Sequence, residues 1–319
     1  MTTAARPAAV GRAGDGSVAP RNRPVRRTGR ATPYLFLAPF LVLFIGFVLV
    51  PAVYGIWVSL HDYNYLLPGK PWVGLQNYTD LFTSSSRDAG PFWYSMRATA
   101  IFTVLSVPFL LVLPLGLALL LNRAFPGRTF FRAVFFTPYV LGVAVVGVLF
   151  RFILEPTIGI VNYYLGLLHL PQPAWTTSTP WVWVTLVGMT VWWTMGFNAI
   201  IYLAGLQDIS PDLYEAAEVD GANKWQQFRY VTLPGLRPVL LFVLTVTILA
   251  SANMFGQSYI TTQGAPDNET RTAIMYIAQT GLREFRQGAA AAMGYILAAV
   301  LIIISLLNFR LFRSEEGES

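Results

Sequence analysis

Residues 206–236 read LQDISPDLYEAAEVDGANKWQQFRYVTLPGL, and this polar stretch decides the fold because long apolar stretches lie on both sides of it. Ser210 is a good N-cap, and Pro211 suits the first position of a helix. Gly221 is a natural stop, since glycine readily takes the left-handed conformation that ends helices. The pattern predicts a short helix that begins at Pro211 and meets Gly221.

A second short helix is predicted over about residues 223–230. Pro234 and Pro238 are then expected to reset the chain, because proline has no backbone N–H to donate to a helix. Together the two helices make residues 206–236 a polar hairpin that connects two apolar segments.

Leu213, Ala216 and Ala217 have the spacing of one helical face, and the small alanines allow another surface to approach closely. Acidic side chains flank that face: Glu215, Glu218 and Asp220. Helices that lie on lipid usually have a basic polar face, so lipid docking is disfavoured here. Two interpretations remain open, a docking element for a partner protein and a simple amphipathic hairpin.

Outside this hairpin the chain has the composition of an integral membrane protein. It is 55% hydrophobic and 12% charged, whereas soluble domains have about 25% charged residues. Charge-free stretches long enough for roughly 20-residue helices predict an all-α, polytopic fold with six transmembrane helices. These spans lie near residues 34–60, 97–121, 131–153, 181–206, 239–260 and 290–310.

The stretch between Glu155 and Asp208 contains no charge, yet we predict one span in it. Its centre, HLPQPAWTTSTP, holds three prolines among polar residues. Such a break at membrane depth would leave backbone groups unpaired in lipid. Residues 157–170 are therefore expected to form an interfacial segment outside the bilayer.

The distribution of Lys and Arg predicts the orientation. With the N-terminus inside, inner segments hold 15 of these residues and outer segments 7, which favours both termini in the cytoplasm. Residues 1–30 are predicted to be a disordered basic tail. Residues 31–312 form the transmembrane domain, and 313–319 a cytoplasmic C-terminal tail.

Several kinds of chemistry find no support in the sequence. There is no cysteine, no phosphate-binding loop and no nucleophile elbow, and the only histidines are His61 and His169. We therefore expect no catalytic residues, metal site or cofactor in this chain. Basic residues lie in short clusters between apolar runs, so nucleic-acid binding is not expected.

The predicted spans carry few polar residues. No carboxylate lies at a span centre, which argues against ion coupling and for an uncharged substrate. Amides, hydroxyls and flat rings suit a sugar, although inter-helix hydrogen bonding commonly explains such polar groups. The candidate substrate-pathway residues are Trp192, Trp193, Asn198, Ser251, Asn253 and Gln257.

The hairpin resembles the "EAA loop" of membrane subunits from binding-protein-dependent ABC importers. The matching residues are Glu215-Ala216-Ala217, Asp220-Gly221-Ala222 and Val231-Thr232-Leu233-Pro234. Further segments resemble the carbohydrate-uptake permeases, covering about residues 33–312. These are Gly74-Leu75-Gln76-Asn77-Tyr78, Phe131-Arg132 with Pro138, Gly205-Leu206-Gln207 and Thr262-Gln263-Gly264-Ala265-Pro266, where Ala265 replaces the family's usual glycine.

This resemblance implies a transport mechanism. A cytoplasmic ATPase dimer, which binds ATP and Mg, would grip the hairpin and switch the spans between inward-open and outward-open states. An extracytoplasmic binding protein would deliver a sugar or oligosaccharide, and an unlike second permease subunit would complete the path through the lipid bilayer. The coupling residues implied are Glu215, Ala216, Ala217, Asp220, Gly221, Leu233 and Pro234.

Two other functions remain open at the level of the sequence. A stand-alone secondary carrier or channel would move its substrate without an ATPase. A membrane enzyme acting on lipid-linked sugars would need an essential acid near the membrane face, and Asp62 and Glu155 are the candidates.

Overall fold

A computed structural model describes residues 32–313, and the described part of the chain is helical, with one isolated β-bridge between His61 and Trp72 and no strand. The predicted basic tail 1–30 and residues 314–319 lie outside the described residues. The chain forms two compact units, divided after Ala52.

The first unit contains a helix with an unusual centre. Helix α1 (Thr32–Phe44) passes through a π-helical turn, η1 (Ile45–Leu49), into α2 (Val50–Ser59), which continues into the second unit. The apolar run Phe36–Ser59 has 24 residues and is long and apolar enough to cross a membrane. It corresponds to the predicted first span.

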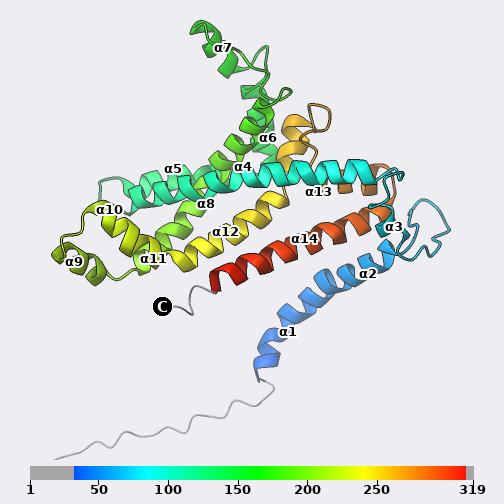
Figure 1. The fold of residues 1–319 in the computed structure, drawn as a ribbon, viewed down its shortest axis with the longest axis horizontal. Coiled ribbons are helices and arrows are strands. Elements are labelled where there is room, and N and C mark those ends of the chain that lie inside the picture. Colours follow the sequence, from blue (N-terminus) through cyan, green and yellow to red (C-terminus); the bar gives the residue numbers. More distant parts are fainter. Residues whose placement is uncertain (1–31, 314–319) are drawn as a thin grey trace, which may run out of the picture. The chain divides into compact units, whose positions relative to one another are not determined.

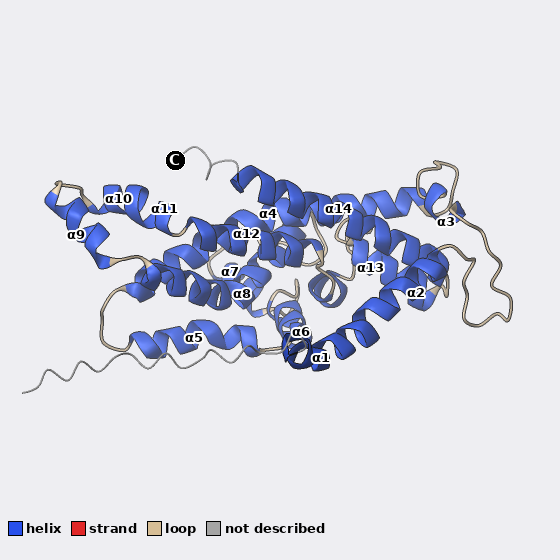
Figure 2. Ribbon diagram, turned by 90° about the horizontal axis from the view of Figure 1, so that it is seen from below, coloured by secondary structure: helices blue, strands red, loops and turns tan. Residues whose placement is uncertain are grey.

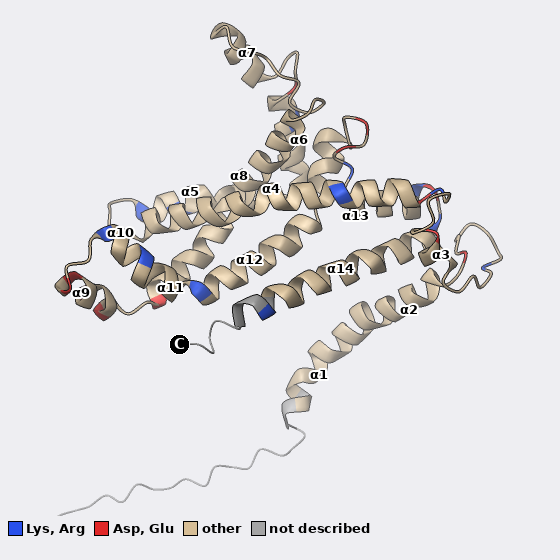
Figure 3. Ribbon diagram, in the orientation of Figure 1, with Lys and Arg blue, Asp and Glu red and all other residues tan. Residues whose placement is uncertain are grey.

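Long helices packed side by side form the second unit (Figure 1). Helix α4 (Ala89–Asn122) packs against α8 (Trp181–Asp208) and α12 (Arg237–Ala252), and α12 also contacts α14 (Gln287–Arg313). Phe102 of α4 and Met189 of α8 belong to one buried cluster. Charged residues lie mainly in the connecting segments and at helix ends (Figure 3), as expected for helices that face lipid.

Four single helices meet the length and composition of a membrane span: Phe36–Ser59, Ala89–Asn122, Trp181–Asp208 and Gln287–Asn308. They match the predicted first, second, fourth and sixth spans, and α4 begins eight residues earlier than the predicted 97. Two further candidates are bent helix pairs, which brings the total to six if each pair is one span.

The predicted span over 131–153 is broken into two helices. Helix α5 (Arg128–Val140) ends at an extended Leu141, and α6 (Val143–Ile153) leaves at 95° to it. Pro138 supplies no N–H near this break. The indole Nε1 of Trp193 donates to the carbonyl of Leu141 at 2.9 Å, so α8 pairs a backbone group that the break frees.

The predicted span over 239–260 is shorter in the structure and is followed by a break. Helix α12 ends at Ala252, and the side-chain amide of Asn253 donates back to the carbonyl of Leu249 at 2.7 Å. The chain then enters a π-helical turn, η3 (Ser258–Thr262). The Leu249 carbonyl therefore accepts from both the backbone N–H and the side-chain amide of Asn253 where the helix ends.

Residues 154–180 lie between the long helices α6 and α8 in sequence and contain one short helix, α7 (Ile160–Leu167). Asn162 is buried, and its amide donates to the carbonyls of Pro156 and Pro173. The indole of Trp175 donates to the Asn162 carbonyl oxygen at 2.7 Å. One buried amide therefore holds together two parts of this segment.

The remaining short helices connect the long ones: α3 (Gln76–Thr79), α9 (Pro211–Val219), α10 (Lys224–Gln227), α11 (Leu233–Gly235), α13 (Ala273–Ala278), and the π-helical turns η2 (Phe228–Thr232) and η4 (Gln279–Arg283). Asn77 of α3 donates to the carbonyls of Ser59 and His61. A Cβ at Gly288 would lie 2.1 Å from the His61 carbonyl, so glycine permits α14 to begin against this loop.

Candidate functional site

The polar hairpin between α8 and α12 begins as the sequence predicts. The Ser210 hydroxyl accepts a hydrogen bond from the backbone N–H of Asp212, and Pro211 is the first residue of α9. The helix ends before Gly221, which takes the left-handed conformation with φ +80°. These local signals therefore place α9 correctly without any tertiary information.

The second helix of the hairpin is longer than predicted. It begins at a capping box formed by Asn223 and Gln226, runs through α10 and η2, and ends with α11 at Gly235. Pro234 lies inside it, where the π-helical turn widens the helix just before the proline. The bend of 67° comes at Leu236, whose side chain is fully buried. The chain therefore changes direction between Pro234 and Pro238, as predicted, although Pro234 itself lies inside the helix.

Helix α9 presents an exposed surface. A side-chain hydrogen bond of 3.0 Å between Tyr214 and Thr232 joins it to η2. Leu213 is 54% exposed and Val219 is 88% exposed, and both belong to a helix with no buried residue. The candidate coupling residues Glu215, Ala216, Asp220, Gly221 and Pro234 are exposed, whereas Ala217 and Leu233 are half-buried. In Figure 2, α9 and α10 project from the end of the bundle.

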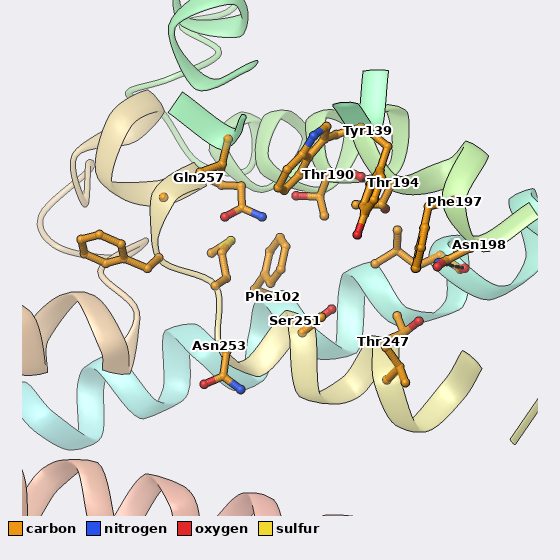
Figure 4. Close-up of a pocket in the computed structure, with 18 residues that line it drawn as sticks. Phe102, Tyr139, Thr190, Thr194, Phe197, Asn198, Thr247, Ser251, Asn253 and Gln257 are labelled. Atoms are coloured by element: carbon orange, nitrogen blue, oxygen red, sulfur yellow. Dashed lines mark hydrogen bonds between the residues drawn. The ribbon is translucent and has the colours of Figure 1, made fainter. Parts of the chain in front are cut away.

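A cavity of about 350 Å³ lies among α4, α5, α8, α12 and the break that follows α12. Its lining includes five of the six candidate pathway residues: Trp193, Asn198, Ser251, Asn253 and Gln257. Figure 4 shows the last four around the same space. Trp192 does not line it; its ring instead packs against Phe150 at a centroid distance of 5.5 Å. Of the two candidate tryptophans, only Trp193 lines this cavity.

Aromatic side chains form one wall of this cavity. The rings of Tyr139 and Phe197 stack at 4.4 Å with an interplanar angle of 13°, and Trp193 lies 6.3 Å from Tyr139. The sequence analysis missed Tyr139, Phe197, and the hydroxyls of Thr190, Thr194 and Thr247. Tyr139 could have been found only from the α5–α8 packing, because it lies far from these residues in sequence.

Some polar groups at the cavity also join helices. The amide of Asn198 donates to the Leu110 carbonyl at 3.2 Å, and the Ser106 hydroxyl donates to Ser251 at 3.1 Å. Gln257 makes no side-chain hydrogen bond within residues 32–313. Its amide is therefore available to a ligand, whereas Asn198 and Ser251 already contribute to helix packing.

The cavity lining contains no Asp, Glu, Lys, Arg or His. The described residues also hold no group of three or more His, Cys, Asp or Glu that could bind a metal ion. A neutral ligand with hydroxyl groups suits this lining, because an ion would lose its hydration without a compensating charge.

Residues 89–314 match a family described as the binding-protein-dependent transport system inner membrane component. The chain belongs to this family. As a permease of the ABC-importer type, it is 34% identical to the arabinooligosaccharides transport system permease protein AraP of Bacillus subtilis, over 91% of each chain. It is 33% identical to the trehalose/maltose transport system permease protein MalF of Thermococcus litoralis, over 85% of the permease and 89% of MalF.

Two solved structures share the fold of the permease. One is a bacterial ABC transporter involved in the import of the acidic polysaccharide alginate, with a TM-score of 0.72 and 26% identity over 89% of the permease and 95% of that chain. The other is the alginate transporter in complex with a pentasaccharide-bound periplasmic protein, with a TM-score of 0.75 and 25% identity over 89% and 94%.

The permease also contains a buried ion pair that the sequence analysis missed. Asp88, 4% exposed, accepts hydrogen bonds from Nη1 and Nη2 of Arg286 at 2.8 and 2.5 Å, and from the Tyr276 hydroxyl at 3.2 Å. Burial raises the pKa of Asp88, but the hydrogen bonds and charge of Arg286 outweigh it and hold this pKa below its ordinary value. The pair joins the start of α4 to the start of α14.

Glu155 and Asp62, the two acids that a membrane enzyme would need, both lie outside the membrane cavity. The Glu155 carboxylate accepts hydrogen bonds from the N–H groups of Ile158 and Thr157 and from the Thr157 hydroxyl. These bonds lower the pKa of Glu155. Asp62 is exposed, and its backbone N–H donates to the Pro71 carbonyl. Neither acid lines the membrane cavity.

Proposed function

We propose that this permease translocates a neutral oligosaccharide that an extracytoplasmic binding protein delivers, and that it contributes no catalytic chemistry or cofactor of its own. The observation that carries the proposal is the charge-free cavity lined by amides, hydroxyls and stacked rings. The names of AraP and MalF support a glycan substrate. The alginate transporter carries an acidic polysaccharide, and the lack of a basic side chain in this cavity favours a neutral one here.

Each wall of the cavity would have its own part in recognition. The stacked rings of Tyr139 and Phe197 offer an apolar face for a sugar ring. The amide of Gln257 and the hydroxyl of Thr194 would exchange hydrogen bonds with sugar hydroxyls. Weak, multiple contacts of this kind suit transport, since the ligand must leave as well as enter.

The energy would come from a separate ATPase dimer that binds ATP and Mg and grips the hairpin. The exposed α9 supports this role, with Glu215 able to pair with a basic group and Ala216 and Ala217 able to lie in a cleft. In this arrangement Asp220 and Gly221 would shape the turn after α9, and Leu233 and Pro234 would connect the hairpin to α12. Both termini would then lie in the cytoplasm, and an unlike second permease would complete a heterodimer.

Transport assays of cavity variants test the substrate role. The complete transporter is reconstituted in liposomes, and binding protein is added. These liposomes should take up arabinotetraose or maltotetraose only when ATP is present. Gln257→Leu should raise the KM for uptake about fivefold, since one hydrogen bond to the ligand is lost. Trp192→Leu is the matched control, because Trp192 lies outside the cavity, and its KM should not change.

Two results would contradict the proposal. Uptake by liposomes that hold this chain alone, driven by an ion gradient, would identify a secondary carrier. Equal KM values for Gln257→Leu and the wild-type permease would show that the cavity does not recognise the substrate.

A further inference from the structure

The loop between η3 and α13 stands between two polar cavities, each of about 440 Å³. Asp267 and Asn268 line both of them. The first cavity also has Arg151, Thr177 and Gln263 in its lining, among others. The second is completed by Gly90, Pro91, Tyr94 and Arg271. The two hollows therefore meet at the tip of one loop.

The lining of these cavities differs from that of the membrane cavity. It combines guanidinium groups, a carboxylate, side-chain amides, threonine hydroxyls and one phenol ring. Neither Arg151 nor Arg271 forms a salt bridge within residues 32–313, and the Nε of Arg271 is buried without a hydrogen-bond partner. The Arg271 guanidinium lies over the Tyr276 ring, with 4.7 Å to its centroid. Both arginines keep N–H donors for a ligand, beside acceptors on the same loop.

The backbone conformation and internal hydrogen bonds of the loop between η3 and α13 hold its shape. Gln263, Asp267 and Asn268 all have positive φ, at 54°, 43° and 66°. Such a conformation is unfavourable for residues other than glycine, and it often occurs where a ligand is held. At the base of the loop the Thr262 and Thr270 hydroxyls share a hydrogen bond of 2.7 Å, and Thr270 donates to the Ala265 carbonyl at 2.8 Å. The polar groups at the tip are therefore preorganised.

The first polar cavity follows the membrane cavity on two elements, η3 and α6. Gln257, just before η3, lines the membrane cavity, and Thr262, at its end, lines the first polar cavity. On α6, Val143 lines the membrane cavity and Arg151 the polar one. Eight residues of helix separate them, a distance of about 12 Å. Charged residues on the loop before α13 are visible in Figure 3.

We propose that these two hollows form one outer glycan groove, made by Tyr94, Arg151, Gln263, Asp267, Asn268 and Arg271. The groove holds consecutive sugar units of the oligosaccharide before they enter the membrane cavity. This inference rests on the proposed function and adds a second binding site to it. A polar, concave and preorganised lining fits hydroxyl groups, whereas the centre of a protein–protein interface is more apolar and aromatic.

A labelling experiment tests the groove directly. The chain has no cysteine, so Asn268→Cys gives it one reactive thiol in the complete transporter. Maltotetraose and arabinotetraose are the probes, added without binding protein, and the rate of maleimide labelling of this chain is measured. Labelling should slow about fivefold at saturating glycan, because only the free fraction reacts. Ser84→Cys, on another exposed loop, should show no change.

The same vesicles are assayed for glycan uptake, which separates the two proposals. Uptake with unchanged labelling of Asn268→Cys would overturn the groove and leave the proposed function intact. Protection by sugar-free binding protein, with none by either tetraose, would make this surface a protein-docking site and would also overturn the groove.

A kinetic measurement tests the groove without placing a cysteine in the loop. Gln263→Ala should raise the KM for tetraose uptake about fivefold and change disaccharide uptake little, since a short glycan cannot reach both cavities. Arg87→Ala, whose side chain is 68% exposed and paired with Glu284 outside the groove, is the control. An equal rise in KM for both glycans would contradict the assignment.

Discussion

The contact between α5 and α8 is so close that a single methyl group should disturb the membrane cavity. A Cβ added at Gly196 would lie 2.0 Å from the Phe135 carbonyl oxygen and 2.8 Å from the Phe136 Cα. Real Cβ contacts shorter than 3.0 Å are essentially never observed, so Gly196→Ala must separate the two backbones by about 1 Å or more. Backbone atoms cannot swing aside as a flexible side chain does.

This displacement has a calculable cost. Overpacking of a close-packed interior typically costs about 1–3 kcal/mol. Tyr139 follows Phe135 on α5 by one helical turn and stacks on Phe197 of α8. A shift of α5 would therefore weaken the aromatic wall of the cavity, and we expect a lower Tm together with a higher KM for uptake.

Thermal unfolding of the purified transporter and glycan uptake check this prediction. Gly188→Ala is the matched control, since it lies on the same helix with nothing within 4 Å of its added Cβ. The control should keep or raise the Tm, because alanine is a better helix former than glycine. If Gly196→Ala unfolds at the wild-type temperature with unchanged KM, the α5–α8 contact is not as described.

The remaining predictions concern the two ends of the bundle. Glu215→Lys combined with Gly221→Pro should abolish co-purification of the ATPase, while Asp62→Lys should retain it. Equal capture by the wild type and by both variants would rule out docking at α9. Asp88→Asn should lower the free energy of unfolding by about 3 kcal/mol. This value is near the low end for a buried pair, because Arg286 is 32% exposed. A double-mutant cycle with Arg286→Met that shows no coupling would refute this prediction. Because the folded pKa of Asp88 lies below its unfolded value, this stabilisation is present above about pH 4 and is lost as the pH falls through the folded pKa. Unfolding measured against pH should show that loss for the wild type and not for Asp88→Asn.

Local chemistry let the sequence predict several features correctly. Helix α9 follows from Ser210, Pro211 and Gly221, which act within one or two turns of the backbone. The four unbroken spans follow from charge-free length, because lipid accepts apolar helices and rejects charges. The polar residues near the cavity were also identifiable, since few polar residues occur at membrane depth.

Tertiary structure decided the features that depend on helix phase and on distant partners. Trp192 and Trp193 are equivalent in sequence, yet a rotation of about 100° between neighbouring helical residues places only Trp193 at the cavity. At the break after α5, the distant side chain of Trp193 pairs the Leu141 carbonyl, which the break leaves without a helical partner. Asp88 and Arg286 are 198 residues apart in sequence and form an ion pair. No local sequence pattern predicts this contact, because its geometry is set only when α4 and α14 have packed.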